Sequence, residues 1–410
     1  MKYIWVLLIF ICGCGGSGKK NNNGLKDTTT EGTENLPSRK RLIGKPHRVA
    51  TTHDLADGIN LTALKLIKTL AETDKNKAYS PTGINWSLFS LYAAANNETK
   101  EEIRKFINAR AGDDVDFTDN QLVLAEKLFT GIDGILSDSR TSLWIDESIK
   151  LKKAFADQQK TVGNIIKNVD LQKPETMTLI NKWIKETSRG LIDKSALIPN
   201  ADSKSIVINT IYFKAQWSYE FKLKDNRDGE FNKAPVTYMN GSQQLHYFEN
   251  AETLSAELDY TNKNFSMILI MPKNKTLKEY CKSFNPDEME KIMSGMNKTF
   301  KSIMMPKFEI STSFDCKEFL KSNGITKAFS IRDADLTQMT EAPIYVDQFK
   351  QRTVIKVNEK GTEAASVTER IEEKKSERSK PIIFDKPFLY LIMEKKTGTI
   401  LFLGQFTNKK

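Results

Sequence analysis

The sequence predicts an α+β fold in which helices come before strands. Apolar residues recur at helical spacing in several segments of the first half, and β-branched and aromatic runs of strand length fill most of the second half. The hydrophobic share of 39% and the charged share of 28% are typical of a soluble globular protein with a sizeable core. Runs of helices followed by runs of strands favour α+β over an alternating architecture.

The first residues, MKYIWVLLIFICGCGGSGKK, predict an export signal. The apolar run is shorter than the roughly 20 residues that a membrane-spanning helix needs. Its end resembles the lipobox of bacterial lipoproteins, with Gly13 as the small residue before the cut. We therefore expect residues 1–13 to be a signal peptide and Cys14 to be lipidated, which would anchor the chain to a membrane of the bacterial cell envelope. An ordinary secretory signal or an uncleaved anchor is the alternative.

Residues 14–50 predict a flexible tether. They are rich in Gly, Asn, Thr, Lys and Pro and show little hydrophobic periodicity. Between Gly15 and Ala50 there are eight basic and three acidic residues, so half of the net charge of +10 lies in this solvated segment. Because no basic stripe interleaved with aromatic residues occurs elsewhere, nucleic-acid binding is not predicted.

Residues 51–410 predict one folded domain without a second linker. The periodicity indicates helices at 54–72, 84–95, 100–108, around 121–129, and at 179–190, where Gly190 ends the pattern. Strand-like runs follow: SIVINTIYFKAQW, FSMILIMP, SIMMPKFEI, TVIKV, FLYLIM and TILFLGQF.

The sequence offers little material for a catalytic site. Of the three histidines, His47 and His53 lie in or beside the tether, so a histidine triad or a zinc site would rest almost entirely on His246. We expect His246 to be a hydrogen-bonded strand residue. No cofactor, metal site or enzymatic activity is predicted.

Two cysteines, Cys281 and Cys316, remain in the body once the signal is removed. They cannot form the dense disulfide framework of small secreted domains. Two buried free thiols are expected, and a disulfide between them is the alternative.

Several segments occur in a fixed order along the chain: AYSPTGINWSLFSLYAAANNETKEEI; NKWIKETSRGLIDKSALIP followed by IVINTIYFKAQW; and MPKFEISTSFDCKEFLKSNGITKAF, NEKGTEAASVT and FDKPFLYLIMEKKTGTILFLGQFTN. Together they resemble the serpin family of protease inhibitors over roughly residues 51–410. With the lipobox, the chain resembles a serpin of a bacterial lipoprotein type.

The resemblance implies a helical N-terminal half packed around three β-sheets, with an exposed reactive loop at about residues 358–381. In the family, a target protease attacks one bond of this loop and forms an acyl-enzyme. The cut loop then inserts into the main sheet as a new strand, which carries the protease across the inhibitor and distorts its active site before water releases it. Such an insertion releases strain stored in a metastable fold.

The first part of the loop suits a segment that must become a central strand. Gly361 supplies backbone freedom, and every second residue from Thr362 to Thr368 is small, so one face of the inserted strand would carry only small side chains. A bulky or charged residue there would slow insertion and let the protease escape. The predicted hinge comprises Glu359, Gly361, Thr362, Glu363, Ala364, Ala365, Ser366 and Thr368.

Two counts along the loop place the reactive bond. Counting forward from Glu359 by the family's usual loop length places it after Lys375, and counting back from Phe388 places it after Ser376. We choose Lys375–Ser376, because a Lys suits the buried carboxylate of a trypsin-like pocket. The alternatives are Lys374 and Arg378. The implied partner is a trypsin-like serine protease, or a cysteine protease of similar specificity, bound by a monomeric inhibitor.

The resemblance also implies a buried polar cluster beneath the point where the sheet opens. The family usually has a second Ser where this chain has Gly83, and a His where it has Gln351. Gln351 can still form hydrogen bonds, with a different geometry and without titrating. The predicted cluster comprises Ser80, Asn209, Trp217 and Gln351.

Two functions of different classes follow. The first is an inhibitory serpin, which the small-residue hinge favours. The second is a non-inhibitory serpin that acts as a binding protein or chaperone and would not need that hinge. Arg370 and Glu372 put charge on the otherwise small face, and burying them unpaired would cost several kcal/mol.

Overall fold

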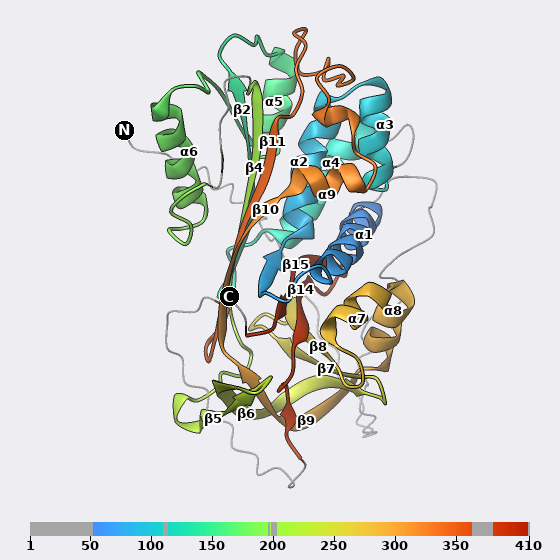
Figure 1. Ribbon diagram of the computed structural model, residues 1–410, viewed down its shortest axis with the longest axis vertical. Coiled ribbons are helices and arrows are strands. Elements are labelled where there is room, and N and C mark those ends of the chain that lie inside the picture. The colour runs from blue at the N-terminus through green and yellow to red at the C-terminus, as the bar shows by residue number, and fades with distance from the viewer. Residues whose placement is uncertain (1–51, 110–113, 196, 198–202, 363–379, 409–410) are drawn as a thin grey trace, which may run out of the picture. The chain divides into compact units, whose positions relative to one another are not determined.

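The computed structural model describes residues 52–109, 114–195, 197, 203–362 and 380–408 (Figure 1). All of its elements belong to one compact unit. Among these residues, no helix is both long and apolar enough to cross a membrane. The helices are α1 (Thr52–Leu70), α2 (Pro81–Ala94), α3 (Asn97–Phe106), α4 (Asp114–Leu128), α5 (Lys153–Thr161), α6 (Pro174–Thr187), α7 (Leu277–Ser283), α8 (Pro286–Gly295) and α9 (Cys316–Ser322), with 3₁₀ turns at Leu223–Asp225 and Lys327–Phe329.

Within the described residues, one sheet has six strands in the order β10-β11-β12-β4-β2-β3, and β4 also pairs directly with β11. β4 and β11 are parallel to each other, whereas the short β12 is antiparallel to both. The strands are β2 (Ile135–Asp146), β3 (Ile165–Val169), β4 (Ser205–Gln216), β10 (Phe308–Asp315), β11 (Gln348–Asn358) and β12 (Gly361–Thr362).

The other described sheet has nine strands. β6 pairs with β9 over Tyr238–Tyr247 and with β7 over His246–Glu249. The described strands therefore form two sheets where the resemblance implied three, and β6 joins β9 and β7 in a single sheet. The strands are β1 (Lys77–Tyr79), β5 (Arg227–Phe231), β6 (Ala234–Glu249), β7 (Thr253–Asp259), β8 (Phe265–Pro272), β9 (Asn297–Pro306), β13 (Ile382–Ile383), β14 (Phe388–Glu394) and β15 (Thr399–Phe406).

Helix α2 lies in the core between the sheets. It contacts β15 of the nine-stranded sheet and β2 and β4 of the six-stranded sheet, and nearly all its residues are buried. Figure 1 shows α2 on one face of β2, β4 and β11 and α6 on the other. On that other face, α6 covers a separate apolar cluster that includes Trp183, Ile206 and Val354.

The five predicted helices are confirmed as α1, α2, α3, α4 and α6. The prediction of SIMMPKFEI as a single strand is wrong, because the chain divides at Lys307 into β9 and β10, which lie in different sheets. Pro306 has no N–H to donate to a ladder, which suits a strand end.

Candidate functional site

The central feature of the site is the line along which β4 and β11 meet, here called the seam. The two strands pair in parallel register from Gln348↔Ile206 to Thr353↔Ile211. Beyond these pairs they diverge, and β12 lies between them, with Thr362 facing Ala215 on one side and Val357 on the other. The seam thus has a closed end, at the six parallel pairs, and a hinge end, at β12.

Gly361 lets the chain enter the hinge end. Its φ is +149°, in the range that favours glycine, and a Cβ there would lie 2.0 Å from the Ala215 carbonyl oxygen. Any larger residue would push β12 away from β4. Thr362, the next residue, is 1% exposed.

A buried hydroxyl pair connects β12 to the nine-stranded sheet. Thr362 Oγ1 lies 2.7 Å from the hydroxyl oxygen of Tyr260, which directly follows β7. The Tyr260 ring stacks on Trp217, with centroids 4.7 Å apart and an interplanar angle of 5°. Burial raises the pKa of Tyr260 far above its usual range, so the phenol keeps its proton and can donate.

The turn before β12 is held by the segment that follows β4. Trp217 donates its backbone N–H to the Lys360 carbonyl at 2.9 Å and its indole N–H to the Asn358 carbonyl at 3.0 Å. The backbone N–H of Phe221 donates to the Glu359 carbonyl at 2.8 Å. These bonds satisfy the polar groups of a tight turn that leads into the loop.

The Glu359 side chain adds an ionic contact at the same place. Its Oε1 accepts a hydrogen bond from Asn226 Nδ2 at 2.7 Å and lies 3.4 Å from Lys307 Nζ. Burial by itself opposes ionisation, but the Asn226 hydrogen bond and the Lys307 charge outweigh it, so the pKa of Glu359 lies below its usual value.

At the closed end, the Gln351 amide joins three segments. Its Oε1 accepts from the Ser80 backbone N–H at 2.9 Å, and its Nε2 donates to the Ser80 carbonyl at 2.9 Å and to Asn209 Oδ1 at 3.4 Å. All three residues are fully buried. Asn209 in turn donates to Ser139 Oγ of β2 at 3.1 Å. One amide side chain thereby ties β11 to β4 and to the residue that caps α2.

Gly83 provides the space for these amides. A Cβ on Gly83 would lie 2.1 Å from Asn209 Oδ1 and 2.8 Å from Gln351 Nε2. Both distances are too short for a real Cβ atom. The two amides can therefore occupy these positions only because residue 83 is glycine.

The structure separates one predicted residue from the rest of its cluster. Ser80, Asn209 and Gln351 lie together, whereas Trp217 lies at the hinge end, with most of β4 between it and Asn209. Sequence reasoning did not identify Tyr260, Asn226 or Lys307, which have no local signal because each meets the hinge through the fold. The following predicted site residues lie outside the described ranges: Cys14, Glu363, Ala364, Ala365, Ser366, Thr368, Lys374, Lys375, Ser376 and Arg378.

One group of described side chains could offer three ligand atoms to a metal ion. His246 of β6, Glu257 of β7 and Asp259 place their donor atoms within 4.8 Å of one another. His246 Nδ1 lies 3.3 Å from Glu257 Oε2, in a strand as expected. The Lys395 ammonium already lies 2.6 Å from Asp259 Oδ1 and 3.5 Å from Glu257 Oε1, so a metal ion would have to displace it.

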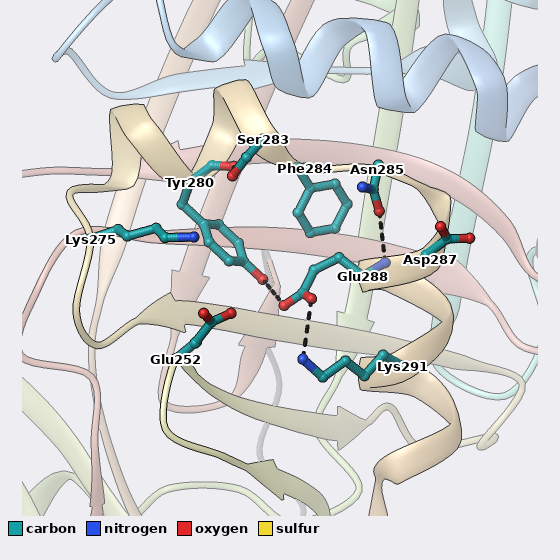
Figure 2. A pocket seen from close by; sticks show the side chains of 9 residues that line it. All are labelled: Glu252, Lys275, Tyr280, Ser283, Phe284, Asn285, Asp287, Glu288 and Lys291. Carbon is teal, nitrogen blue, oxygen red and sulfur yellow. Dashed lines mark hydrogen bonds and ion pairs between the residues drawn. The ribbon is translucent and has the colours of Figure 1, made fainter.

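Two hollows lie away from the seam. Figure 2 shows the first, about 260 Å³, beside α7 and α8, where Tyr280 donates to Glu288 Oε1 at 3.0 Å and Lys291 Nζ lies 3.6 Å from Oε2. The second, about 610 Å³, is lined by the start of α7 and the end of β15. Neither is lined by a residue of the hinge or of the Gln351 cluster.

The two body cysteines are free and buried, as expected. Burial raises the pKa of Cys281 to about 12 and that of Cys316 well above its usual value. Both thiols therefore stay protonated at neutral pH, which suits packing more than nucleophilic chemistry.

Comparisons with known proteins point to one family. The model of the family "Serpin (serine protease inhibitor)" matches residues 57–409. An uncharacterized serpin-like protein of Thermococcus kodakarensis is 28% identical over 99% of this chain and 98% of its own length. Serpin-ZXA of Oryza sativa subsp. japonica is 30% identical over 82% of this chain and 90% of its own length.

Solved structures share the fold. Human thyroxine-binding globulin superposes with a TM-score of 0.78 at 24% identity, covering 87% of this chain and 98% of its own. The thermophilic serpin tengpin in the native state superposes with a TM-score of 0.77 at 22% identity, covering 90% and 97%. At these identities the likeness concerns the fold alone.

Proposed function

Since the chain belongs to the serpin family, we propose that it is a suicide-substrate inhibitor of a trypsin-like serine protease, or of a cysteine protease of similar specificity. One observation carries this proposal: the first two residues after the turn, Gly361 and Thr362, already lie between β4 and β11 and pair with both. A cut loop would only need to continue a strand that has begun.

The register of β12 supports continued insertion. Extended residue by residue, it would place Ser366 between Ile211 and Thr353, and Ile371 between Ile206 and Gln348. These flanking residues are the ones that pair with each other along the closed end. β4 and β11 would therefore separate by one strand width without sliding. Two antiparallel ladders would replace one parallel ladder. This exchange favours insertion, because parallel pairing is slightly less stable per residue than antiparallel pairing.

The composition of the hinge fits the same register. Ala364 would lie between Phe213 and Ile355, two buried residues that face the core. Only a small side chain suits a gap that is closed by such neighbours. Thr368 would lie between Asn209 and Gln351, where the strand must part the Gln351 amide from its partner.

Within this proposal the reactive bond is Lys375–Ser376, with Lys374 and Arg378 as alternatives. A basic residue before the bond matches proteases whose pocket carries a buried carboxylate. We further propose a lipoprotein signal at residues 1–13, a lipid anchor at Cys14 and a tether over residues 14–50. The inhibitor would then be held at the envelope of a bacterial cell.

The second candidate is a non-inhibitory binding protein or chaperone. The charge of Arg370 favours it, because the extended register would place this side chain between Val207 and Phe349, which are 1% and 0% exposed. An unpaired guanidinium in such a position would oppose the last steps of insertion.

The test is to mix the purified chain with trypsin and to analyse the products by denaturing gel and intact mass. The proposal predicts a covalent complex that survives denaturation and a released peptide that begins at Ser376. A peptide with another start would move the reactive bond and keep the mechanism. Loop cleavage without any complex, with trypsin and with other serine and cysteine proteases, would overturn the inhibitor proposal in favour of the binding protein.

A further inference from the structure

We propose that the hydroxyl groups of Tyr260 and Thr362 form a clip that holds the first residues of the loop in the six-stranded sheet before any protease arrives. Tyr260 is then a positioning residue for the proposed inhibition. The clip itself is a property of the uncut chain, and only its effect on trapping rests on the proposed function.

The first observation is the contact between the two sheets. Thr362 belongs to the six-stranded sheet, whereas Tyr260 extends from β7 of the nine-stranded sheet, 102 residues away in sequence. Their oxygens are 2.7 Å apart and buried, so water cannot replace the bond. Within the described residues, this is the only hydrogen bond that the Thr362 hydroxyl makes.

The second observation is that the Tyr260 hydroxyl is held in a fixed position. Its ring is stacked on Trp217 and meets Phe213 edge-on, with centroids 5.2 Å apart. The backbone of Tyr260 also bridges to Trp217 and donates to the Phe265 carbonyl at 3.0 Å. Because the Tyr260 hydroxyl is held in place, it can determine where the Thr362 side chain lies.

The third observation is that few contacts hold β12 itself, beyond the turn that precedes it. It contributes two residue pairs to each neighbouring strand, and one of its residues is glycine, which has no side chain to pack. Such a short strand frays easily, so one buried side-chain bond has a large share in its occupancy. Loss of the clip would let residues 361–362 leave the seam more often.

The experiment is hydrogen–deuterium exchange of the full chain, read by mass spectrometry on peptides that cover β12 and residues 213–216. Tyr260→Phe and Thr362→Val keep the shapes and remove one hydroxyl each. Each should speed exchange about five- to tenfold, because the remaining hydroxyl is left buried without a partner. The double variant should exchange no faster than either single variant, since each single change already breaks the one bond and the double variant leaves no buried hydroxyl without a partner.

Two control variants accompany these. Tyr238→Phe removes another buried tyrosine hydroxyl, which bonds the Glu230 carbonyl at 2.7 Å in the nine-stranded sheet, and should leave exchange at β12 unchanged. Thr362→Ser keeps the hydroxyl and should resemble the wild type. Exchange in Tyr260→Phe that stays within twofold of the wild type, or single effects that simply add in the double variant, would overturn the clip.

Trapping is measured separately on the same variants. Tyr260→Phe should raise the number of inhibitor molecules consumed per trapped protease about two- to fivefold, because the hinge must re-enter the seam before insertion proceeds. Coupled exchange in a chain that never traps a protease would support the clip and overturn the inhibitor proposal. Coupled exchange with unchanged consumption in a trapping chain would overturn the role of the clip in inhibition.

Discussion

The two ends of the seam are held by different chemistry. At the hinge end, a glycine turn, stacked aromatic rings and a single hydroxyl pair position β12. At the closed end, β4 and β11 are joined by two fully buried amides, and Gln351 Nε2 donates to Asn209 Oδ1. A hydrogen bond of this kind contributes only about 1 kcal/mol net, because folding exchanges bonds to water for bonds within the protein. Under the proposed mechanism, the hinge end would start insertion and the closed end would give way to it.

The largest effect is expected from breaking the hinge end with Thr362→Arg. The guanidinium would have to enter a position that is 1% exposed, between Ala215 and Val357 and against Tyr260. The inhibitor should become a substrate, with the number of molecules consumed per trapped protease rising at least about tenfold. Lys360→Arg, at a neighbouring position that already carries charge, is the control and should trap as the wild type does. Undiminished trapping by Thr362→Arg would indicate that inhibition does not depend on how this residue packs in the seam.

The next effect is expected at the closed end from Gly83→Ala. Its Cβ would collide with the Asn209 and Gln351 amides, so the free energy of unfolding should fall by about 1–3 kcal/mol, as for other overpacked cores. Urea unfolding followed by circular dichroism measures the change. The matched control is Gly131→Ala, where the nearest atom, on Leu136, is 3.7 Å from the new Cβ. Equal stability of the two variants would contradict the fit of the amides to the glycine.

A smaller effect, in the opposite direction, is expected from Arg370→Thr in the loop. In the extended register the new side chain would lie between Val207 and Phe349 without burying a charge. The fraction of protease trapped should rise a few-fold in the gel assay. An unchanged or lower fraction would count against the register, or against insertion reaching that depth.

The smallest effect is expected from Glu359→Gln at the hinge end. The amide can still accept from Asn226, so only the attraction to the half-exposed Lys307 is lost, which is worth less than about 1 kcal/mol. Since folding lowers the pKa of Glu359, its contribution is present above the unfolded value of about 4.3 and is lost as the pH falls through the lower folded-state value. Urea unfolding of both proteins at pH 7 and near pH 3 should show a difference at pH 7 alone. A difference that persists near pH 3 would assign it to another cause.

The parts of the fold that were predicted are those with a strong local pattern. The helix α1 and the strands β14 and β15 carry clear periodicity or unbroken apolar runs. β2 was missed because its sequence, ILSDSRTSLWID, is polar even though most of it is buried. Within the core, Thr141 Oγ1 of this strand lies 3.0 Å from Ser87 Oγ, so the two hydroxyl groups form a hydrogen bond. Polar residues can therefore be buried in β2, and a search for apolar runs does not detect the strand.

The same limit applies to the site. Gln351 and Ser80 were found because the resemblance aligns both with the buried polar cluster of the family, although 271 residues separate them. Tyr260 meets Thr362 where the residue after β7 bridges to Trp217, the residue after β4, and nothing in its neighbouring residues indicates this contact. A long-range contact of this kind depends on the register of two sheets, which no single segment of sequence specifies.

The shared register of β12, β4 and β11 has a mechanical consequence. When two paired strands slide past each other in shear, all the hydrogen bonds between them bear the force at once. When the strands are separated from one end, as in unzipping, only the residue pair at the point of separation bears it. A strand advancing from the hinge end would open the pairs from Thr353↔Ile211 to Gln348↔Ile206 one at a time and would pair with both edges as it moves. At any moment the loop would then have to supply only the force that separates one residue pair, whatever the length of the seam.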